Sequence, residues 1–323
     1  MERHGYNFGD SWMMTWAGDG RTFTNFSDGR FVKAGPKPSN AILTIDDDPP
    51  DLRPESFVKV SADPLDRRKS WAHYIINTIF VGDTLYVGAV NFAYDAGIAR
   101  SDDMGKTLIY DQEKPMWSGK ARTRFVYPSF LQNGRGYSGN TDGYMYVYGS
   151  DGVWGRTNVL RLARVPTDRI EDITAYEYYT GTGWSRNQDD AAVLLRDGTN
   201  LGGMQSIVYN PVLERYFLIT FGDTYNHRAR MVLYDAPQPW GPWHRCGMIA
   251  ADDALFLLGE LRTKIYNPSF NAKWIDADGS MWISYANYTP QYSFHYGKLT
   301  VRMKQPDRPP TVPASSDPPI SDR

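Results

Sequence analysis

The sequence predicts an all-β protein, a five-bladed β-propeller with mostly four-stranded antiparallel blades. Three observations lead to this prediction: a hairpin pattern occurs five times, further strand-like segments follow most copies, and convincing helical patterns are missing. Each copy has a short strand, a turn of Asp, Gly or Asn, and a strand rich in aromatic and β-branched residues, which is typical of a β-hairpin. The five copies cover residues 11–26, 76–90, 137–149, 206–222 and 271–286.

The segments between these hairpins complete the predicted blades. Residues 29–35 and 40–46, for example, are strand-like and follow the first hairpin. Each unit then has about four strands, and loops of unequal length are compatible with a propeller. The fifth unit is short, so we expect residues 3–9 to supply its outer strand and close the ring. Residues 252–264 have some helical spacing and are expected to form one or two turns in a loop.

Length alone allows one or two domains, and the repeated hairpin pattern favours one. We expect the propeller over residues 1–304, followed by a Pro-rich and polar tail or linker without fixed structure over residues 305–323. The net charge of -2 and the pI of about 6.2 argue against nucleic-acid binding. No apolar run approaches the ~20 residues that span a bilayer, so we expect no membrane insertion. We also expect a monomer.

The sequence predicts neither a cofactor nor a metal site. Cys246 is the single cysteine, so it has no partner for an intramolecular disulfide, and no Cys/His spacing is typical of zinc. We interpret Cys246 as structural.

Residues 100–110 contain the pattern Ser-x-Asp-x-Gly-x-Thr, which resembles the Asp-box of sialidase-like propellers. The matching positions are Ser101, Asp103, Gly105 and Thr107. Asp and Thr side chains bond turn amides, and Gly adopts a positive φ, so the motif is interpreted as a structural turn. It supports the propeller prediction and carries no information on substrate.

Two aspartates flank the first hairpin and are the candidate catalytic residues. In a four-stranded blade, the inner strand begins at the face where active sites lie, and the next turn lies at the opposite face. Asp10 opens the first inner strand and Asp28 closes the strand after it, so both should share one face, while Asp19 lies in the turn between them. Glycoside cleavage requires such a carboxylate pair. The alternative is that both residues only stabilise turns, a common role of Asp.

Aromatic and polar residues are predicted near the same face, where they could bind a sugar. Flat rings pack against sugar faces, and amide, imidazole and guanidinium groups bond hydroxyls. Glu260 could serve as an alternative acid, but its position favours the interpretation as a surface glutamate. The candidate substrate-binding residues are Trp12, Trp16, His73, Asn140, Arg186, Asn187, Gln205, Tyr225 and Asn267.

Several segments, among them residues 10–29, 136–149 and 202–220, resemble the family known as domain of unknown function 4185, which is associated with glycoside hydrolase family 183. The resemblance extends over residues 9 to about 304. It implies a five-bladed propeller that acts as an endo-D-arabinofuranase on α-D-arabinofuranosyl linkages of mycobacterial arabinogalactan and lipoarabinomannan. The family's catalytic aspartates would then correspond to Asp10 and Asp28.

The resemblance leaves two other functions open. One is a five-bladed glycosidase acting on another furanoside, such as L-arabinan or fructan, and the other is a non-catalytic carbohydrate-binding propeller. A sialidase is disfavoured, because a single Asp-box is present. D-arabinan lies in the cell envelope, so we expect a secreted or envelope protein whose leader lies outside this chain.

Overall fold

The computed structural model is an all-β protein, which confirms the all-β part of the predicted fold class. Its described helical segments are 3-10 turns of three residues each. No helix in the described part of the chain is long and apolar enough to cross a membrane. The structure describes residues 8–30, 40–66, 68–91, 93, 95–118, 124–151, 158–196, 204–222, 230–250, 265–287 and 293–302. The segment 252–264, for which helical turns were expected, lies outside these ranges.

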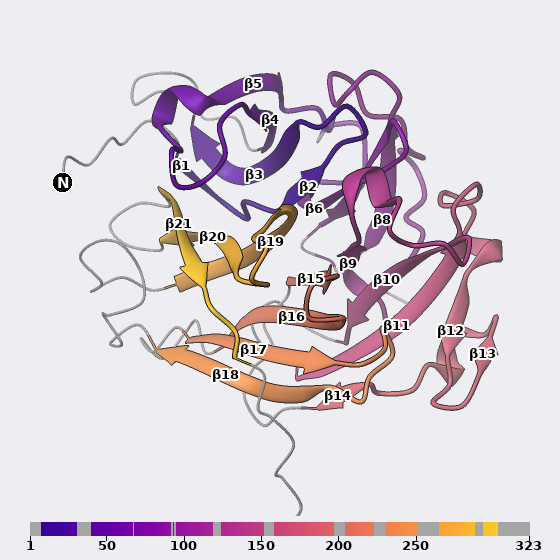
Figure 1. The fold of residues 1–323 in the computed structure, drawn as a ribbon. Coiled ribbons are helices and arrows are strands. Elements are labelled where there is room, and N and C mark those ends of the chain that lie inside the picture. The colour runs from indigo at the N-terminus through magenta and orange to yellow at the C-terminus, as the bar shows by residue number, and fades with distance from the viewer. Residues whose placement is uncertain are drawn as a thin grey trace, which may run out of the picture.

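The strands form antiparallel groups that follow one another around a common centre, a propeller-like arrangement (Figure 1). Successive strands of a group pair with one another, as in a β-meander. The first two groups contain β2 (Met14–Trp16), β3 (Thr22–Arg30), β4 (Asn40–Ile45) and β5 (Phe57–Ala62), followed by β6 (Tyr74–Val81), β7 (Thr84–Val90) and β8 (Ala96–Ser101).

The remaining strands continue this order along the chain. The third group contains β9 (Val126–Gln132), β10 (Tyr144–Ser150), β11 (Val159–Pro166), β12 (Glu177–Tyr179), β13 (Trp184–Ser185) and β14 (Leu195–Arg196). The fourth contains β15 (Gln205–Asn210), β16 (Arg215–Gly222), β17 (Arg230–Ala236) and β18 (His244–Ala250), and the fifth contains β19 (Ile265–Ile275), β20 (Met281–Asn287) and β21 (Ser293–Leu299).

The first strand given above for each group lies nearest the centre, and these inner strands contact one another in cyclic order. The order is β2, β6, β9, β15 and β19, and β19 in turn contacts β2. The pair β9 and β15 even forms parallel bridges, with Ile207 opposite Leu131.

Hydroxyl side chains bind neighbouring inner strands to one another. The backbone N–H of Phe80 donates to Thr15 Oγ1 (3.0 Å), and that of Phe270 donates to Ser206 Oγ (2.9 Å). In the same way, the backbone N–H of Gln205 donates to Ser129 Oγ, and that of Met14 donates to Ser269 Oγ. Four of the five inner-strand contacts therefore use one device, in which a Ser or Thr oxygen accepts from an amide that would otherwise be buried without a partner.

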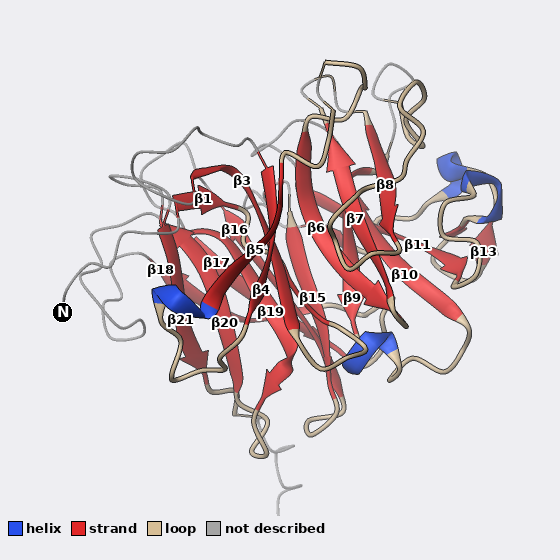
Figure 2. Ribbon diagram, turned by 90° about the horizontal axis from the view of Figure 1, so that it is seen from above, coloured by secondary structure: helices blue, strands red, loops and turns tan. Residues whose placement is uncertain are grey.

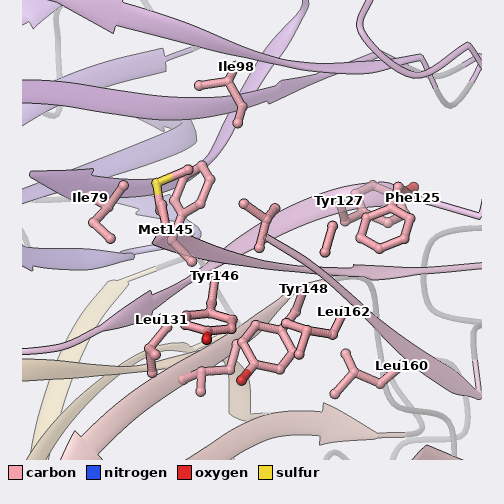
Figure 3. Close-up of a cluster of buried hydrophobic side chains, with 14 of the residues drawn as sticks. Ile79, Ile98, Phe125, Tyr127, Leu131, Met145, Tyr146, Tyr148, Leu160 and Leu162 are labelled. Atoms are coloured by element: carbon pink, nitrogen blue, oxygen red, sulfur yellow. The ribbon is translucent and has the colours of Figure 1, made fainter. Parts of the chain in front are cut away.

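The hydrophobic core is divided into layers between adjacent groups. Phe23 and Ile42 of the first group pack with Phe80 and Leu85 of the second, and equivalent layers lie between later groups. Figure 3 shows the layer in which Ile79 and Ile98 of the second group approach side chains of the third, including Met145. Because each of these clusters combines side chains of at least two groups, no group buries its apolar faces alone.

The two ends of the molecule differ (Figure 2). One end, here called the turn end, carries the hairpin turns that follow each inner strand. Arg135 Nε donates to Gly18 O (2.7 Å) and Asn210 Nδ2 to Gly279 O (2.9 Å), so turns of different groups contact each other there. The opposite end, called the start end, is where β6, β9, β15 and β19 begin.

Residues 3–9 were expected to supply the outer strand of the fifth unit, and the structure describes two of them, residues 8 and 9, which belong to a strand that pairs with the fifth group. Strand β1 (Phe8–Asp10) pairs with β21, with Phe8 opposite Ser293, and pairs on its other side with β3. One short strand thus joins the last group to the first.

One predicted hairpin was wrong. The third copy was placed at residues 137–149, but its inner strand is β9, and residues 133–143 form the turn that leads to β10. Pro128 lies inside β9 and made that segment look unlike a strand, because proline donates no ladder hydrogen bond.

The Asp-box is a turn that follows β8 on the outside of the second group. Asp103 Oδ1 accepts from Ser101 Oγ (2.8 Å) and Thr107 N (2.9 Å), and its Oδ2 accepts from Thr107 Oγ1 (2.7 Å). Gly105 has φ of 88°. The bonds from the Thr107 amide and hydroxyl lower the pKa of Asp103 to about 2.

We expect Asp103→Ala to lower the free energy of unfolding at pH 7 by about 1 kcal/mol, because turn donors lose an ionised acceptor. The folded-state pKa of Asp103 lies below its usual 3.8, so its contribution is present above about pH 4 and is lost as the pH falls towards about 2. The difference from wild type should therefore shrink between pH 7 and pH 3 in urea unfolding. The exposed Asp168→Ala serves as control, and an equal loss in both variants would contradict the role of Asp103.

Candidate active site

Asp10 and Asp28 lie on neighbouring strands at the start end. Asp10 ends β1 directly opposite Ser27 of β3, and Asp28 is the next residue of β3. Opposite residues of an antiparallel pair have Cα atoms about 4.5–5.5 Å apart, and consecutive Cα atoms are about 3.8 Å apart. The Cα atoms of the two aspartates are therefore within about 9 Å of each other.

The strand pairing is irregular at this point. Phe8 faces Arg30 and Asp10 faces Ser27, so β3 has one residue more than β1 in this interval. The extra residue forms a β-bulge, and Asp28 within it adopts φ of 48°, in the left-handed region. Bulges redirect side chains and occur beside active sites. This one takes Asp28 out of the regular alternation of β3.

The carboxylate of Asp10 is buried and fixed by hydroxyl groups. The residue is 7% exposed, and its Oδ1 accepts from Ser27 Oγ (2.6 Å) and Ser11 Oγ (3.2 Å). Asp28 is half-buried. The two carboxyl groups therefore lie in different environments, which is how a pair of acids acquires different roles.

Asn267 is connected to Asp10 through Ser11. Its Nδ2 donates to Ser11 Oγ (2.8 Å), and its Oδ1 is buried without a hydrogen-bond partner. Asn267 lies near the start of β19 in the left-handed region, with φ of 44°.

Gln205 begins β15 and is completely buried. Its backbone N–H donates to Ser129 Oγ and its carbonyl accepts from Asn77 Nδ2 (3.3 Å). Both atoms of its side-chain amide lack a hydrogen-bond partner. Buried amides are nearly always paired, so this group is unusual and marks a place where water or a ligand can bind.

His73 directly precedes β6 and is half-buried at the same end. Its backbone carbonyl accepts from Asn40 Nδ2 (2.9 Å), and its N–H donates to Val90 O. The structure thus places His73, Gln205 and Asn267 at the end where Asp10 and Asp28 lie.

Three other candidates lie elsewhere. Trp12 is completely buried among Phe26, Phe57 and Phe294, and its Nε1 donates to Gly9 O, so its ring is part of the core. Trp16 ends β2 and borders the turn end. Asn140 lies in the turn 133–143, where its Nδ2 donates to Asp142 Oδ1 and Tyr144 O. Its placement at the start end was wrong, because the third hairpin had been assigned to the wrong residues.

The remaining candidates lie at the margin of the third group or outside the described residues. Arg186 and Asn187 are exposed, and Asn187 Oδ1 accepts from Asp189 N at the start of a 3-10 turn. Tyr225 and Glu260 belong to segments that the structure does not describe. Asp19 lies in the turn after β2, paired with Arg21 (2.7 Å), at the opposite end from Asp10 as expected.

Sequence reasoning missed Ser11, Ser27 and Asn77. Their signal is weak, because serine and asparagine are common in turns, and nothing local shows that Ser11 and Ser27 face a carboxylate or that Asn77 contacts Gln205. Ser11 directly follows Asp10 in the sequence and precedes a tryptophan, so its proximity to Asp10 could have been noticed. Ser27 becomes a partner of Asp10 only through the register of the two strands.

Cys246 is not a candidate nucleophile. Desolvation, followed by the negative charge of Asp235, raises the pKa of its thiol to about 12, although the residue lies at the exposed edge strand β18. Its Sγ contacts Leu233 O at 3.5 Å. Within the described ranges no group of three or more His, Cys, Asp and Glu side chains is arranged to hold a metal ion.

Solved structures share this fold. A GH62 α-L-arabinofuranosidase catalytic domain from Coprinopsis cinerea is 10% identical, covers 93% of this chain and 92% of its own, and has a TM-score of 0.58. An α-L-arabinofuranosidase from Podospora anserina, solved with cellotriose, is 11% identical with 92% coverage of both chains and a TM-score of 0.55. A GH43_1 enzyme from Xanthomonas citri is 16% identical, covers 93% and 89%, and has a TM-score of 0.57. At these identities the likeness concerns the fold.

Family membership follows from the sequence itself. No curated protein matches the chain. Residues 2–255, which include Asp10, Asp28, His73 and Gln205, match a single described family. The chain therefore belongs to the family described as Domain of unknown function (DUF4185).

Proposed function

We propose that this protein is a glycoside hydrolase, an endo-D-arabinofuranase that cleaves α-D-arabinofuranosyl linkages of mycobacterial arabinogalactan and lipoarabinomannan. The observation that carries the proposal is the register of β1 and β3, which brings Asp10 and Asp28 to adjacent positions. Carboxyl separations in glycosidases range from about 5 to 9.5 Å, and the estimated backbone spacing is compatible with that range.

We further propose that the architecture is a five-bladed β-propeller. Support comes from the cyclic contacts of β2, β6, β9, β15 and β19 and from the antiparallel group that begins with each of these strands. In a propeller, inner strands converge on an axis, so groups at their starting ends border one depression.

The environments of the two acids suggest their roles. Asp10 accepts two hydroxyl hydrogen bonds, which favour an ionised carboxylate, so it suits the nucleophile or the base that activates water. Asp28 would then donate its proton to the glycosidic oxygen as the bond from that oxygen to the anomeric carbon breaks. The anomeric carbon gains its new bond either to Asp10 or to the oxygen of the activated water, whose proton passes to Asp10.

Another furanoside is the second candidate substrate. The fold is shared with α-L-arabinofuranosidases, which favours L-arabinofuranosyl chains over unrelated glycans. Incubation with purified D-arabinan, L-arabinan and fructan separates these substrates by their products. Binding of a glycan without new reducing ends would instead favour a carbohydrate-binding protein. We expect secretion or a cell-envelope location, because the proposed substrate lies there.

We expect Asp10→Asn and Asp28→Asn each to lower kcat on D-arabinan by about 10³-fold, because either change removes a group needed for proton transfer or attack. The melting temperature of Asp28→Asn should stay close to that of wild type. Asp19→Asn, at the turn end, is the matched control and should keep full activity. Oligosaccharide release measured by chromatography checks this, and full activity of Asp28→Asn would refute the assignment.

Gln205→Leu should separate ligand binding from stability. The side-chain amide of Gln205 makes no hydrogen bond, so its loss should leave the melting temperature unchanged or raise it. If the amide binds a substrate hydroxyl or a bound water, KM should rise about 10-fold. Asn210→Leu on the same strand is the control, because its amide bonds Gly279 O and two turn amides and its loss should lower the melting temperature. A clear loss of stability in Gln205→Leu would argue for a structural role.

A further inference from the structure

Three polar side chains form a hydrogen-bonded row that ends on Asp10. Asn267 Nδ2 donates to Ser11 Oγ (2.8 Å), and Ser11 Oγ donates to Asp10 Oδ1 (3.2 Å). Ser11 and Asn267 are completely buried. Asn267 belongs to β19 of the fifth group, whereas Ser11 and Asp10 belong to the amino-terminal segment, so the row crosses the closure of the ring.

The direction of the Ser11 hydroxyl follows from its partners. A serine hydroxyl has one proton and two lone pairs, and the Nδ2 group of Asn267, which faces it, can only donate. The hydroxyl proton is then free to point to the carboxylate. The backbone of Ser11 is also held, because its carbonyl accepts from Asn25 Nδ2 (3.0 Å) and from Met13 N.

The backbone conformations at both positions add a second observation. Ser11 has φ of 63° and Asn267 has φ of 44°, and L-residues other than glycine rarely adopt such values. Strained backbone of this kind is stable only where the surrounding structure determines it. Glycine adopts such values readily, whereas these two positions carry a hydroxyl and an amide that bond each other.

We propose that Asn267 is a positioning residue, which acts through Ser11 to hold the Asp10 carboxylate in the orientation needed for attack or for activation of water. The proposal rests on the proposed glycosidase function. It assigns Asn267 an indirect role instead of the direct substrate contact that the sequence suggested. It also makes the geometry of Asp10 depend on the docking of the last group against the first.

The left-handed backbone conformations of Ser11 and Asn267 determine which substitutions can test the proposal. Asn267→Gly and Ser11→Gly remove one member of the row and keep a backbone that glycine adopts readily, so both should fold. Asn267→Asp keeps shape but offers Ser11 an acceptor, which would draw the hydroxyl away from Asp10. Glu214→Gly is the matched control: it has φ of 52°, is exposed, and lies in the turn after β15 at the other end.

On a cleaved furanoside, Asn267→Gly and Asn267→Asp should lower kcat about 10-fold with KM within about twofold. In Asn267→Gly the acidic limb of the rate profile should move to higher pH, because the Ser11 hydroxyl is no longer oriented toward the ionised carboxylate of Asp10. The described titratable residues on strands that contact β1 are unchanged in every variant: Asp28 on β3, Tyr285 on β20, and His295, Tyr296 and Lys298 on β21. Asn267→Gly adds no charge, so the pH profile is compared for this variant, whereas Asn267→Asp adds a carboxyl group beside Asp10 and is compared in kcat and KM at a single pH.

The titration of the Asp10 carboxyl group, followed by ¹³C NMR without substrate, tests whether the hydrogen bonds from Asn267 through Ser11 act on Asp10. This test does not require that the wild type cleave a furanoside. The midpoint of the titration should rise in Asn267→Gly and Ser11→Gly and stay unchanged in Glu214→Gly. If the wild type is inactive but the midpoint of the Asp10 titration rises in the variants, the proposed function is refuted while the positioning role of Asn267 stands. An unchanged titration, or an equal loss of kcat in Glu214→Gly, would overturn the positioning role.

Discussion

The fold depends on satisfying the backbone amides along the inner strands. These strands lie side by side around the centre but diverge, so continuous ladders between them do not form; among the described strands, the parallel bridges of β9 and β15 are short. The buried amides left over must find acceptors. Thr15, Ser129, Ser206 and Ser269 supply them from the preceding strand in four of the five contacts. A hydroxyl at this position fixes both the spacing and the relative height of neighbouring groups.

The same constraint explains why the start end is irregular. Ser11, Tyr127 and Asn267 adopt positive φ near the beginning of three inner segments, and bulges interrupt the pairing of β6, β9 and β19 nearby. Strained backbone of this kind is stable only where surrounding contacts determine it. The regular parts of the same strands supply those contacts, since they are buried between two apolar layers. These contacts of the regular segments thus hold the irregular segments at the start end in place.

Much of the fold could be predicted, because hairpins leave local signals. Aromatic and β-branched runs around a Gly or Asp turn located four of the five hairpins, and the short fifth unit indicated that the amino terminus closes the ring. The third hairpin failed because Pro128 disguised β9 and the polar turn 133–143 looked like part of a strand. For the site, Asp10 and Asp28 followed from strand order alone. Ser11, Ser27 and the contact between Asn267 and Ser11 depend on register and ring closure, which no local pattern contains.

The closure of the ring connects the folding of this chain with its proposed chemistry. Bonds from Ser284 Oγ to Trp12 O and from Lys273 to Asp48 join the last group to the first, beside the bond from Asn267 to Ser11. The buried carboxylate of Asp10 is costly unless hydroxyl donors surround it, and one of its two described donors is oriented from across this closure. An open ring would leave Asp10 without that orientation. Because the Asp10 carboxylate acquires this orientation only when the last group contacts the first, the proposed catalytic activity depends on completion of the fold.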